Sequence, residues 1–293
     1  MAPVIAIHGG AGTLRKADMT AARAERYRAG LQFALEQGFR ILEKGGSSLD
    51  AVTAAVVAME DSPLFNAGRG AVYNADARHE LDAAIMDGKT LRAGAVACVE
   101  RIRNPVLAAR AVMERSRHVL LAGKGAERFA GKQGLKMANQ KYFGTAARLE
   151  ALRRNLQSHH GTVGAVALDR DGNLAAATST GGYTGKLPGR IGDSPLVGAG
   201  TYADNRACAV SGTGLGEAFI RALVAYDVAA RMRYRRQSLA VAARAALASV
   251  ARLGGDGGLV AVDRRGNVAM PFNSQGMYRA CIDRRGRRSV AIY

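Results

Sequence analysis

Apolar and polar positions along the first half of the chain form blocks that predict strands and helices in turn. The apolar run PVIAIHGG (3–10) has strand length, and apolar residues then recur at helical spacing from about Thr20 to Lys44 and from Leu49 to Glu60. Short apolar runs bounded by turn residues predict further strands, and a segment that begins with Asn-Pro predicts a helix. These segments are GAVYN (70–74), ELDAAIMDG (80–88) and AGAVACVE (93–100) for the strands, and NPVLAARAVMERS (104–116) for the helix.

The second half contains hairpins separated by helices. Three segments each place two apolar runs around an Asp-x-x-Gly turn, in which glycine can take the positive φ that closes a bulged hairpin. Helical spacing predicts helices at about 216–233 and 238–252. Because strands group with strands and helices with helices, we expect a single α+β domain over residues 1–293, a four-layer αββα sandwich of two packed sheets covered by helices. The hairpin segments are TVGAVALDRDGNLAAATS (162–179), GLVAVDRRGNVAMPFN (258–273) and YRACIDRRGRRSVAIY (278–293).

Residues 124–158 are polar, rich in lysine and arginine and weakly periodic, so we expect a linker or a mobile helix there. No run approaches the ~20 apolar residues that a membrane span needs, and the N-terminus enters an apolar strand without a basic leader. We therefore expect a cytoplasmic protein. Cys98, Cys208 and Cys281 are far apart and match no metal-ligand spacing, which predicts buried, reduced thiols.

The net charge of +18 raises the alternative of a protein that binds nucleic acid or another polyanion. Residues 1–161 contain 24 basic and 15 acidic residues and residues 162–293 contain 18 and 9, so each part has a net charge of +9. Only RMRYRR (231–236) and RRGRR (284–288) concentrate this charge locally. Aromatic residues make up 5% of the chain, which leaves few side chains for base stacking. We favour a diffusely basic surface, and an uncleaved polyanion-binding protein stays open as the alternative.

Most familiar catalytic signatures are absent from the sequence, which contains no HExxH, CxxC, GxSxG or P-loop motif. SGTGLGE (211–217) resembles a dinucleotide-binding loop, because its glycines follow an apolar strand and precede a helix. However, Glu217 occupies the position of the last glycine of that motif, and no acidic residue is placed to bind a ribose, which argues against nucleotide binding. The loop still offers backbone N–H groups at a helix start, which suit a developing negative charge.

The segment HHGTVGAVALD (159–169) places Gly161 and Thr162 at the start of a predicted buried strand. A threonine hydroxyl is a poor nucleophile without a base, and its own α-amino group can be that base once the threonine is an N-terminus. A free α-amine has a pKa of about 8, so much of it accepts protons near neutral pH. Glycine tolerates strained geometry, which would let the Thr162 hydroxyl attack the Gly161 carbonyl. The pair is a candidate autocleavage site, with an ordinary strand start as the alternative.

Motifs over almost the whole chain carry a family resemblance: IAIHGGAGT (5–13), EDSPLFNAGRGAVYN (60–74), ELDAAIMDG (80–88), RNPVLAARAVME (103–114), HGTVGAVALDRDGNLAAATSTGG (160–182), GKLPGRIGDSPLVGAGTYA (185–203), SGTGLGE (211–217) and GGLVAVDRRGNVAMPFNSQGMYRA (257–280). They resemble the plant-type L-asparaginases, also called isoaspartyl aminopeptidases, of the N-terminal nucleophile hydrolases. The resemblance covers residues 4 to about 280. It implies the αββα fold, autocleavage into an α subunit (1–161) and a β subunit (162–293), and an (αβ)2 heterotetramer.

The resemblance also implies the catalytic residues. Thr162 in HGTVG matches the family nucleophile, and Thr180 in ATSTGG matches the second threonine, whose hydroxyl orients and polarises the first. Thr213 and Gly214 in SGTGLGE match the oxyanion hole, with one hydroxyl and one backbone N–H facing the oxygen that becomes negative. Asn66 resembles the asparagine that assists autocleavage.

The implied reaction is hydrolysis of the side-chain amide of L-asparagine and of the isopeptide bond of β-aspartyl dipeptides, with release of L-aspartate. Arg190 and Asp193 in GRIGDSP match the substrate clamp, in which a guanidinium holds the α-carboxylate and an aspartate takes the α-ammonium. Gly214 also lies at this substrate site, and the carbonyl of Gly216 meets the α-ammonium. Gly185 replaces the asparagine of the family stretch Thr-Asn-Lys, so the relative preference for substrates is expected to differ.

The loop MEDSPLFNAGRG (59–70) matches the family segment that holds a structural sodium ion through main-chain carbonyls, which suits a hard cation. No organic cofactor is implied. His8 belongs to the N-terminal HGG motif, and we expect a packed histidine there. The expected sodium ligands are the carbonyl oxygens of Met59, Glu60, Ser62, Phe65, Ala67 and Arg69.

Overall fold

The computed structural model describes residues 1–12, 16–154 and 161–293, whose strands form a larger and a smaller β-sheet. The larger sheet contains β1 (Val4–Gly12), β2 (Leu81–Asp87), β3 (Ala93–Val99), β4 (Leu120–Ala122), β5 (Val163–Leu168), β6 (Leu174–Thr180), β11 (Gly276–Ile282) and β12 (Arg288–Ala291). The smaller sheet contains β7 (Thr201–Ala203), β8 (Cys208–Gly214), β9 (Gly257–Asp263) and β10 (Val268–Ala269). Their orders are β12-β11-β1-β5-β6-β2-β3-β4 and β10-β9-β8-β7, so β5 lies inside the larger sheet between β1 and β6.

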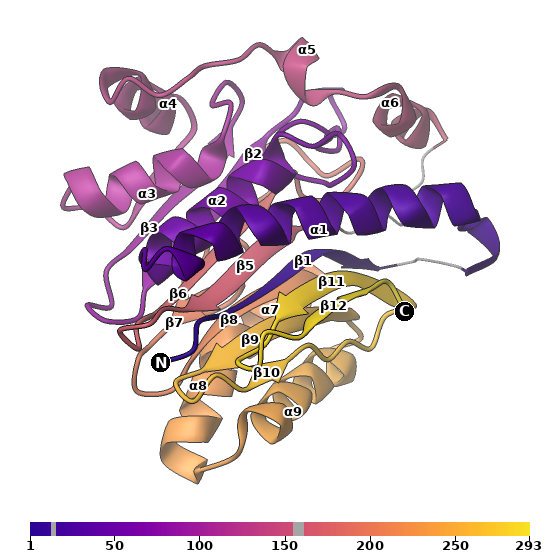
Figure 1. Cartoon of the computed structure of the whole chain (residues 1–293). Helices are drawn as coiled ribbons and strands as arrows, with labels where there is room; N and C mark the ends of the chain where they lie inside the picture. The colour runs from indigo at the N-terminus through magenta and orange to yellow at the C-terminus, as the bar shows by residue number, and fades with distance from the viewer. Residues whose placement is uncertain (13–15, 155–160) are drawn as a thin grey trace.

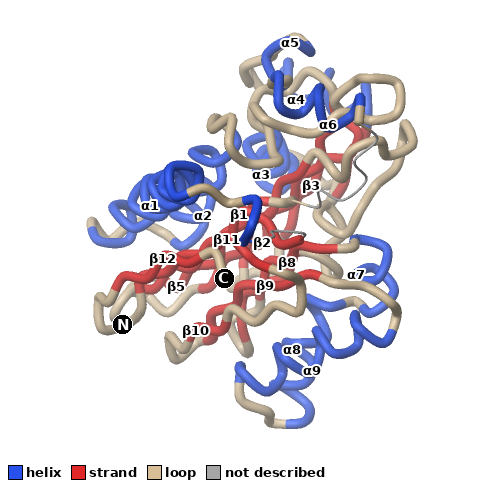
Figure 2. Tube along the Cα trace, turned by 90° about the vertical axis from the view of Figure 1, so that its right-hand side faces the viewer, coloured by secondary structure: helices blue, strands red, loops and turns tan. Residues whose placement is uncertain are grey.

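Helices cover the outer faces of the two sheets, while the inner faces pack on each other (Figures 1 and 2). On the larger sheet lie α1 (Ala21–Glu43), α2 (Ser48–Glu60) and α3 (Pro105–Arg115). On the smaller sheet lie α8 (Val224–Arg235) and α9 (Leu239–Arg252), with the short α7 (Gly216–Ala222) following β8. The expected α+β class is therefore observed.

Strand β1 shows how the residue pattern produces these layers. Side chains alternate between the faces of a strand. Ile5 and Ile7 accordingly belong to the core beneath the helices, whereas Val4 and Ala6 belong to the core between the sheets, together with Val260 of the smaller sheet. All five side chains are fully buried, and burial of a valine or isoleucine contributes about 1.5–3 kcal/mol. Because β1 is buried on both faces, its ends are fixed in position.

The three Asp-x-x-Gly turns close the hairpins that the sequence predicts. In the β5–β6 turn the Asp169 carboxylate accepts hydrogen bonds from the backbone N–H groups of Asp171 and Asn173. Gly172 has φ +83°, a conformation that glycine takes without a steric penalty. The same arrangement recurs at Asp263 and Asp283. The β5–β6 turn sets the register of β5 against β6, and therefore places Thr162 near Thr180 at the other end of the hairpin.

Two elements differ from the sequence-based prediction. GAVYN (70–74) is not a strand, because its backbone bonds to other segments instead of to a neighbouring strand: the N–H of Gly70 donates to the carbonyl of Phe143, and that of Asn74 to the carbonyl of Arg78. The predicted helix 216–233 is interrupted at Leu223, which has φ +46°. Just after it, the N–H groups of Ala225 and Tyr226 donate to the carbonyls of Ala199 and Gly198 instead of continuing the helix, a tertiary interaction that helical spacing does not report.

The predicted linker, residues 124–158, is largely helical where the structure describes it. It contains most of α4 (Gly123–Lys132) and all of α5 (Gln140–Phe143) and α6 (Ala146–Arg153), and it lies at the top of Figure 1. Residues 155–158 lie outside the described residues. None of the helices in the described part of the chain is long and apolar enough to cross a membrane. The three cysteines are free thiols, and Cys98 is half-buried rather than buried; it lies in β3 with φ +51°, where the register of β2 on β3 shifts.

Candidate active site

Thr162 lies immediately before β5, in the interior of the larger sheet, and is only 6% exposed. Since β5 pairs with β6, Thr162 lies near Thr180 at the end of β6. The Thr162 hydroxyl donates to Thr180 Oγ1 over 3.1 Å. The Thr180 hydroxyl in turn donates to the carbonyl oxygen of Gly161 over 3.0 Å. The hydroxyl predicted to attack and the carbonyl predicted to be cleaved are therefore joined through one side chain.

Asn66 supplies a second donor to the same carbonyl. Its Nδ2 donates to the carbonyl oxygens of Gly161 and Gly182, each over 2.6 Å. Its Oδ1 accepts from the N–H of Val72 over 2.9 Å, which fixes the orientation of the amide. Two fixed donors on one carbonyl oxygen can stabilise negative charge that develops there. The Gly161 carbonyl thus lies in a small oxyanion site formed by Asn66 and Thr180.

Glycine is required where β1 approaches the scissile bond. Gly10 has φ +111°, and a Cβ atom there would lie 2.9 Å from the Cα atom of Gly161 and 3.2 Å from the nitrogen of Thr162. Both contacts involve backbone, which cannot move aside cheaply. The close approach of β1 to the Gly161-Thr162 bond therefore depends on the absence of a side chain at Gly10.

Thr213 and Gly214 reach the site from the smaller sheet, at the end of β8. Thr213 Oγ1 accepts from the N–H of Ala11 over 3.1 Å, so the end of β1 contacts the scissile bond and Thr213 together. Gly214 has φ +151°, and a Cβ atom there would lie 2.3 Å from the carbonyl oxygen of Asp256. The predicted oxyanion residues thus lie across the sheet interface from Thr162, held by β1.

The predicted substrate clamp is assembled around Gly216. A Cβ atom on Gly216 would lie 2.7 Å from Arg190 Nη2 and 2.9 Å from Asp193 Oδ1, so all three residues line one small space. Arg190 forms a bidentate ion pair with Glu217, with both N···O distances 3.0 Å, and its guanidinium lies 4.7 Å from the centre of the Tyr183 ring. The Glu217 carboxylate thus occupies the guanidinium that the family resemblance assigns to the substrate carboxylate.

Asp193 is buried, and its Oδ2 atom is without a hydrogen-bond partner. Burial raises the pKa of the Asp193 carboxyl to about 6, although the backbone N–H of Asp193 and the Arg190 charge oppose that increase. A buried carboxylate with a free oxygen is suited to a cationic ligand, because an ammonium group would supply both the charge and the missing hydrogen bond.

His8 is fully buried and contacts the candidate nucleophile, a contact that the sequence analysis missed. Its Nδ1 lies 3.0 Å from the carbonyl oxygen of Thr162 and its Nε2 lies 2.9 Å from Ser211 Oγ. Burial lowers the pKa of His8 to about 3, so the ring is neutral. A carbonyl can only accept, so Nδ1 carries the proton and Nε2 accepts from Ser211. Thr178 and Thr201 extend this chain of hydroxyls, with O···O distances of 2.7 and 2.6 Å.

The sequence gives a weak indication of this chain of hydroxyl groups. Thr178 and Ser211 place hydroxyl groups inside two buried strands of mostly small residues, β6 and β8, which also contain Ser179, Thr180 and Thr213. Buried hydroxyls in such strands need partners, so two of them predict contact across a sheet interface. Choosing His8 as the third member requires the pairing of β1 with β5, which periodicity does not provide.

Several carbonyl groups of the loop that follows α2 lie close to Gly68 and Gly70. A Cβ atom on Gly70 would lie 2.7 Å from the carbonyl oxygens of both Pro63 and Phe65. A Cβ atom on Gly68 would lie 2.4 Å from the carbonyl oxygen of Glu60. The remaining predicted ligands, Met59, Ser62, Ala67 and Arg69, lie at the end of α2 or in the same loop. The backbone carbonyls of Met59 and Glu60 also accept from the N–H groups of Ser62 and Arg69.

The Glu60 carboxyl group lies beside this loop and is buried. Its Oε1 accepts from Ser179 Oγ and the N–H of Val106, while Oε2 is without a partner. Burial raises the pKa of Glu60 to about 8. In residues 1–12, 16–154 and 161–293, no three or more His, Cys, Asp and Glu side chains gather as metal ligands. A cation in this region would therefore depend on main-chain oxygens.

Gly185 has φ +74°, with open space around the position of a Cβ atom. Asparagine takes this left-handed conformation more readily than most residues, so the family asparagine fits the same backbone. Its neighbour Lys186 is fully buried and donates to the carbonyl of Glu80 over 2.9 Å. The replacement therefore removes an amide group from a position whose backbone suits either residue.

The sequence matches the Asparaginase_2 family model, described as asparaginase, over residues 1–160 and 153–292. The chain is 55% identical to the isoaspartyl peptidase of Escherichia coli (strain K12), with 94% of this chain and 92% of that protein aligned. It is 56% identical to the isoaspartyl peptidase of Salmonella typhimurium, with 94% of each aligned. It is also 43% identical to the isoaspartyl peptidase/L-asparaginase of Bos taurus, with 94% of this chain and 92% of that protein aligned. The chain therefore belongs to the Asparaginase_2 family.

Proposed function

We propose that this protein hydrolyses the side-chain amide of L-asparagine and the isopeptide bond of β-aspartyl dipeptides, releasing L-aspartate, with Thr162 as an N-terminal nucleophile. One observation carries the proposal: the Thr162 hydroxyl is bonded to Thr180, which is bonded to the Gly161 carbonyl. The names of the relatives support the substrate class.

Cleavage of the chain comes first. As Oγ1 of Thr162 attacks the carbonyl carbon of Gly161, its proton passes to Thr180 Oγ1. The Thr180 hydroxyl passes its own proton to the Gly161 oxygen, which Asn66 also hydrogen-bonds, and this second proton is the one that the leaving nitrogen takes up. The C–N bond then breaks, the nitrogen takes up a proton, and an ester joins Gly161 to the threonine oxygen. Water hydrolyses this ester to leave a Gly161 carboxylate, a free Thr162 hydroxyl and a Thr162 amine. The products are the two subunits, 1–161 and 162–293.

The new amine then acts as the base for the second reaction. It takes the proton of the Thr162 hydroxyl, and Oγ1 attacks the β-carbonyl carbon of the substrate. Thr213 Oγ1 and the N–H of Gly214 stabilise the oxyanion. The amine returns the proton to the departing nitrogen, which leaves as ammonia or as an amino acid. Water hydrolyses the β-aspartyl ester and releases aspartate.

The clamp orients the substrate for this attack. Arg190 binds the α-carboxylate in the place that Glu217 occupies in the structure, and Asp193 and the Gly216 carbonyl bind the α-ammonium. The substrate carboxylate must therefore displace Glu217 from Arg190. That exchange replaces one bidentate ion pair by another, so its net cost is small.

The finer structural expectations belong to the same proposal. The two packed sheets with helices on their outer faces support the four-layer αββα sandwich of the N-terminal nucleophile hydrolases, as one domain. We also propose the (αβ)2 assembly and a cytoplasmic location.

We propose that carbonyl groups of the loop around Gly68 and Gly70 hold a structural sodium ion, which would fix the loop that carries Asn66. A protein that melts at a higher temperature in sodium chloride than in choline chloride at equal ionic strength would support this ion. Equal melting temperatures would count against it.

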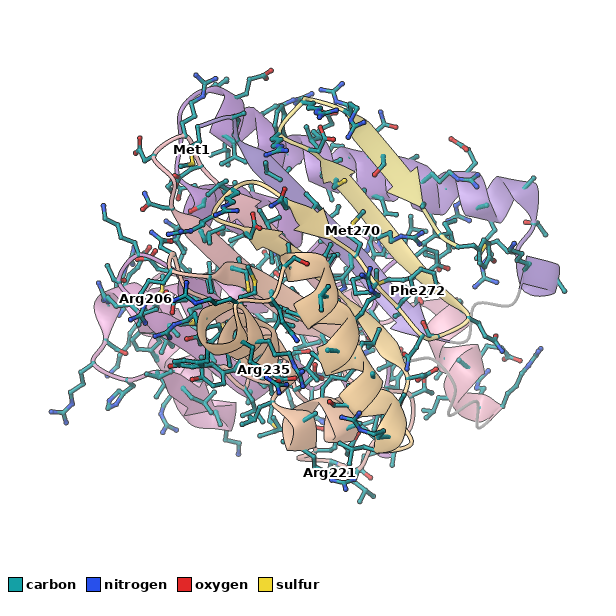
Figure 3. The ribbon with its side chains drawn as sticks, turned by 90° about the horizontal axis from the view of Figure 1, so that it is seen from below. Met1, Arg206, Arg221, Arg235, Met270 and Phe272 are labelled. Atoms are coloured by element: carbon teal, nitrogen blue, oxygen red, sulfur yellow. The ribbon has the colours of Figure 1, made fainter. Side chains whose placement is uncertain are left out.

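The alternative of a polyanion-binding protein gains no support from the site. Seen from below, the labelled side chains of Arg206, Arg221 and Arg235 come from separate elements, the β7–β8 turn, α7 and α8 (Figure 3). All three are exposed, and basic residues occur on many helices and turns and on β11 and β12 of the larger sheet. This distribution is that of a diffusely basic surface.

The activity test compares Thr162→Ala with Thr162→Ser. We expect Thr162→Ala to release aspartate from asparagine at least 10³-fold more slowly, as about that much is lost when a catalytic group is removed, and Thr162→Ser to retain measurable turnover. Thr90→Ala, a change of an exposed threonine on the β2–β3 turn, is the control. Full activity of Thr162→Ala would exclude the mechanism.

A further inference from the structure

A cavity of about 570 Å³ lies beside the candidate active site, between α1, the loop after α2 and α6. Arg23, Arg26 and Tyr27 of α1 line one side, Leu64 lines the second and Arg148 of α6 the third. No residue assigned to catalysis or to the substrate clamp lines it. Its position next to the scissile bond raises the question of which ligand it accepts.

A second, smaller cavity borders both this one and the predicted scissile bond. It shares Arg23, Tyr27, Leu64 and Arg148 with the larger cavity, and it is also lined by Gly10, Asn66 and Gly161. The two cavities are therefore adjacent; together they are called the arginine cavity, and its inner end lies at the carbonyl side of the bond between Gly161 and Thr162.

The charged side chains described around the arginine cavity are all positive. Among the described residues that line either part, none is acidic. Arg148 is partly buried and donates its Nε to the Gly70 carbonyl over 2.8 Å. Burial and the nearby positive charge of Arg23 both lower the pKa of Arg148. Guanidinium groups that repel each other across one cavity favour an anion between them, and a carboxylate fits their geometry.

The proposed chemistry determines what reaches this cavity. The amine of Thr162 gives its proton to the departing nitrogen of the substrate, so that nitrogen must lie within hydrogen-bond distance of the amine. In the uncleaved chain of the structure, the nitrogen of Thr162 is bonded to Gly161, and Gly161 lines the arginine cavity. The leaving amino acid therefore lies on the side of Thr162 where the arginine cavity begins.

From these observations, and resting on the proposed function, we propose that the arginine cavity binds the α-carboxylate of the amino acid that leaves a β-aspartyl dipeptide. Arg23 and Arg148 hold the carboxylate, and Tyr27 and Leu64 contact an apolar side chain on the leaving residue. Ammonia from asparagine has neither group. The cavity thus selects dipeptides with a free C-terminus over asparagine and over substrates whose C-terminus is blocked.

The test varies the carboxylate on the substrate and the arginines on the protein. We compare kcat/KM for β-aspartyl-leucine with kcat/KM for β-aspartyl-leucinamide, which lacks the carboxylate charge. The unaltered protein is expected to prefer the free acid at least tenfold, and Arg23→Gln/Arg148→Gln to lose that preference. The matched control, Arg28→Gln/Arg153→Gln, alters exposed arginines of the same two helices outside the cavity and should keep it. A preference below twofold in the unaltered protein, or a preference that survives the double change, overturns the proposal.

Two further measurements keep the result unambiguous. Arg148 contacts the Gly70 carbonyl, so Arg23→Gln alone is measured as well; Arg23 is exposed on α1, and this variant should lose most of the preference without unfolding. Leucine and leucinamide are also compared in thermal unfolding. Leucine should raise the melting temperature of the unaltered protein more than leucinamide does, and the two should be equal in the double variant. If the protein hydrolyses neither asparagine nor a dipeptide, the proposed function is wrong. The thermal unfolding still tests the subsite in that case: equal increases of the melting temperature with leucine and with leucinamide in the unaltered protein would overturn it.

Discussion

Asn66 connects three segments of the chain through one amide group. It donates to the Gly161 and Gly182 carbonyls and accepts from the N–H of Val72, so its Nδ2 cannot turn away from the scissile carbonyl without losing bonds on both sides. A donor held in this way needs no reorganisation when negative charge develops on the Gly161 oxygen.

Asn66→Ala should therefore slow autocleavage by about 10²–10³-fold, the usual cost of one oxyanion donor. Asn66→Asp keeps the shape but loses the donor, and it should be as slow as Asn66→Ala. The fraction of cleaved chain is followed over time on a denaturing gel after purification. Cleavage of Asn66→Asp at the rate of the unaltered protein would show that the amide only fills space.

The raised pKa of Asp193 gives a pH dependence at the residue scale. Burial shifts its pKa upward to about 6, so the carboxyl is protonated, and unable to bind the substrate ammonium as an anion, as the pH falls below that value. The quantity kcat/KM reports the free enzyme, whereas kcat reports the complex, in which the bound ammonium keeps Asp193 ionised.

For asparagine, kcat/KM should lose an additional factor of about ten per pH unit below pH 6, and kcat should lack this step. The pH profiles of both constants are measured from pH 4.5 to 8. The same pH dependence for both constants would contradict the assigned role of Asp193.

At the scale of elements, the two sheets are joined by the hydrogen-bonded chain from Thr201 through Thr178 and Ser211 to His8. Gly164 makes room for it, because a Cβ atom there would lie 1.9 Å from Ser211 Oγ. The chain is fully buried and ends on the carbonyl of Thr162. It therefore links the packing of the sheets to the position of the nucleophile.

Ser211→Ala should destabilise the protein by about 1–3 kcal/mol, because Nε2 of His8 and the Thr178 hydroxyl both lose a buried partner. Ser249→Ala on α9 is the comparison, since that serine bonds only within its own helix, and its effect should stay within about 0.5 kcal/mol. Denaturant unfolding measures both. Equal stability of the two variants would mean that the chain of hydroxyls contributes nothing to the sheet interface.

The elements also show what sequence patterns can and cannot predict. The hairpin turns are encoded locally, since each Asp-x-x-Gly turn is closed by its own aspartate and glycine, and β5 and β6 were predicted correctly for that reason. The break at Leu223 depends on carbonyls of residues 198 and 199, which periodicity does not detect. GAVYN has the composition of a strand, but its backbone bonds go to loops.

At the scale of the whole molecule, the site gathers residues from distant parts of the chain. His8, Asn66, Thr162 and Ser211 meet because β1 pairs with β5 and packs on β8. The family motifs predict the catalytic threonines, the clamp and the oxyanion residues without any knowledge of contacts. They gave no role for His8 and no sign of the arginine cavity, since both depend on contacts between α1, β1, α6 and β8 that only the folded chain shows.

The most direct test of the account is the intact mass of the purified, fully active protein, with the N-terminal residue of each fragment determined. We predict two fragments, 1–161 and 162–293, the second beginning with Thr162, and a single unbroken chain for Thr162→Ala. An unaltered protein that hydrolyses asparagine at its full rate with the bond between Gly161 and Thr162 unbroken would contradict the central claim, because the hydroxyl would then react without a free amine beside it.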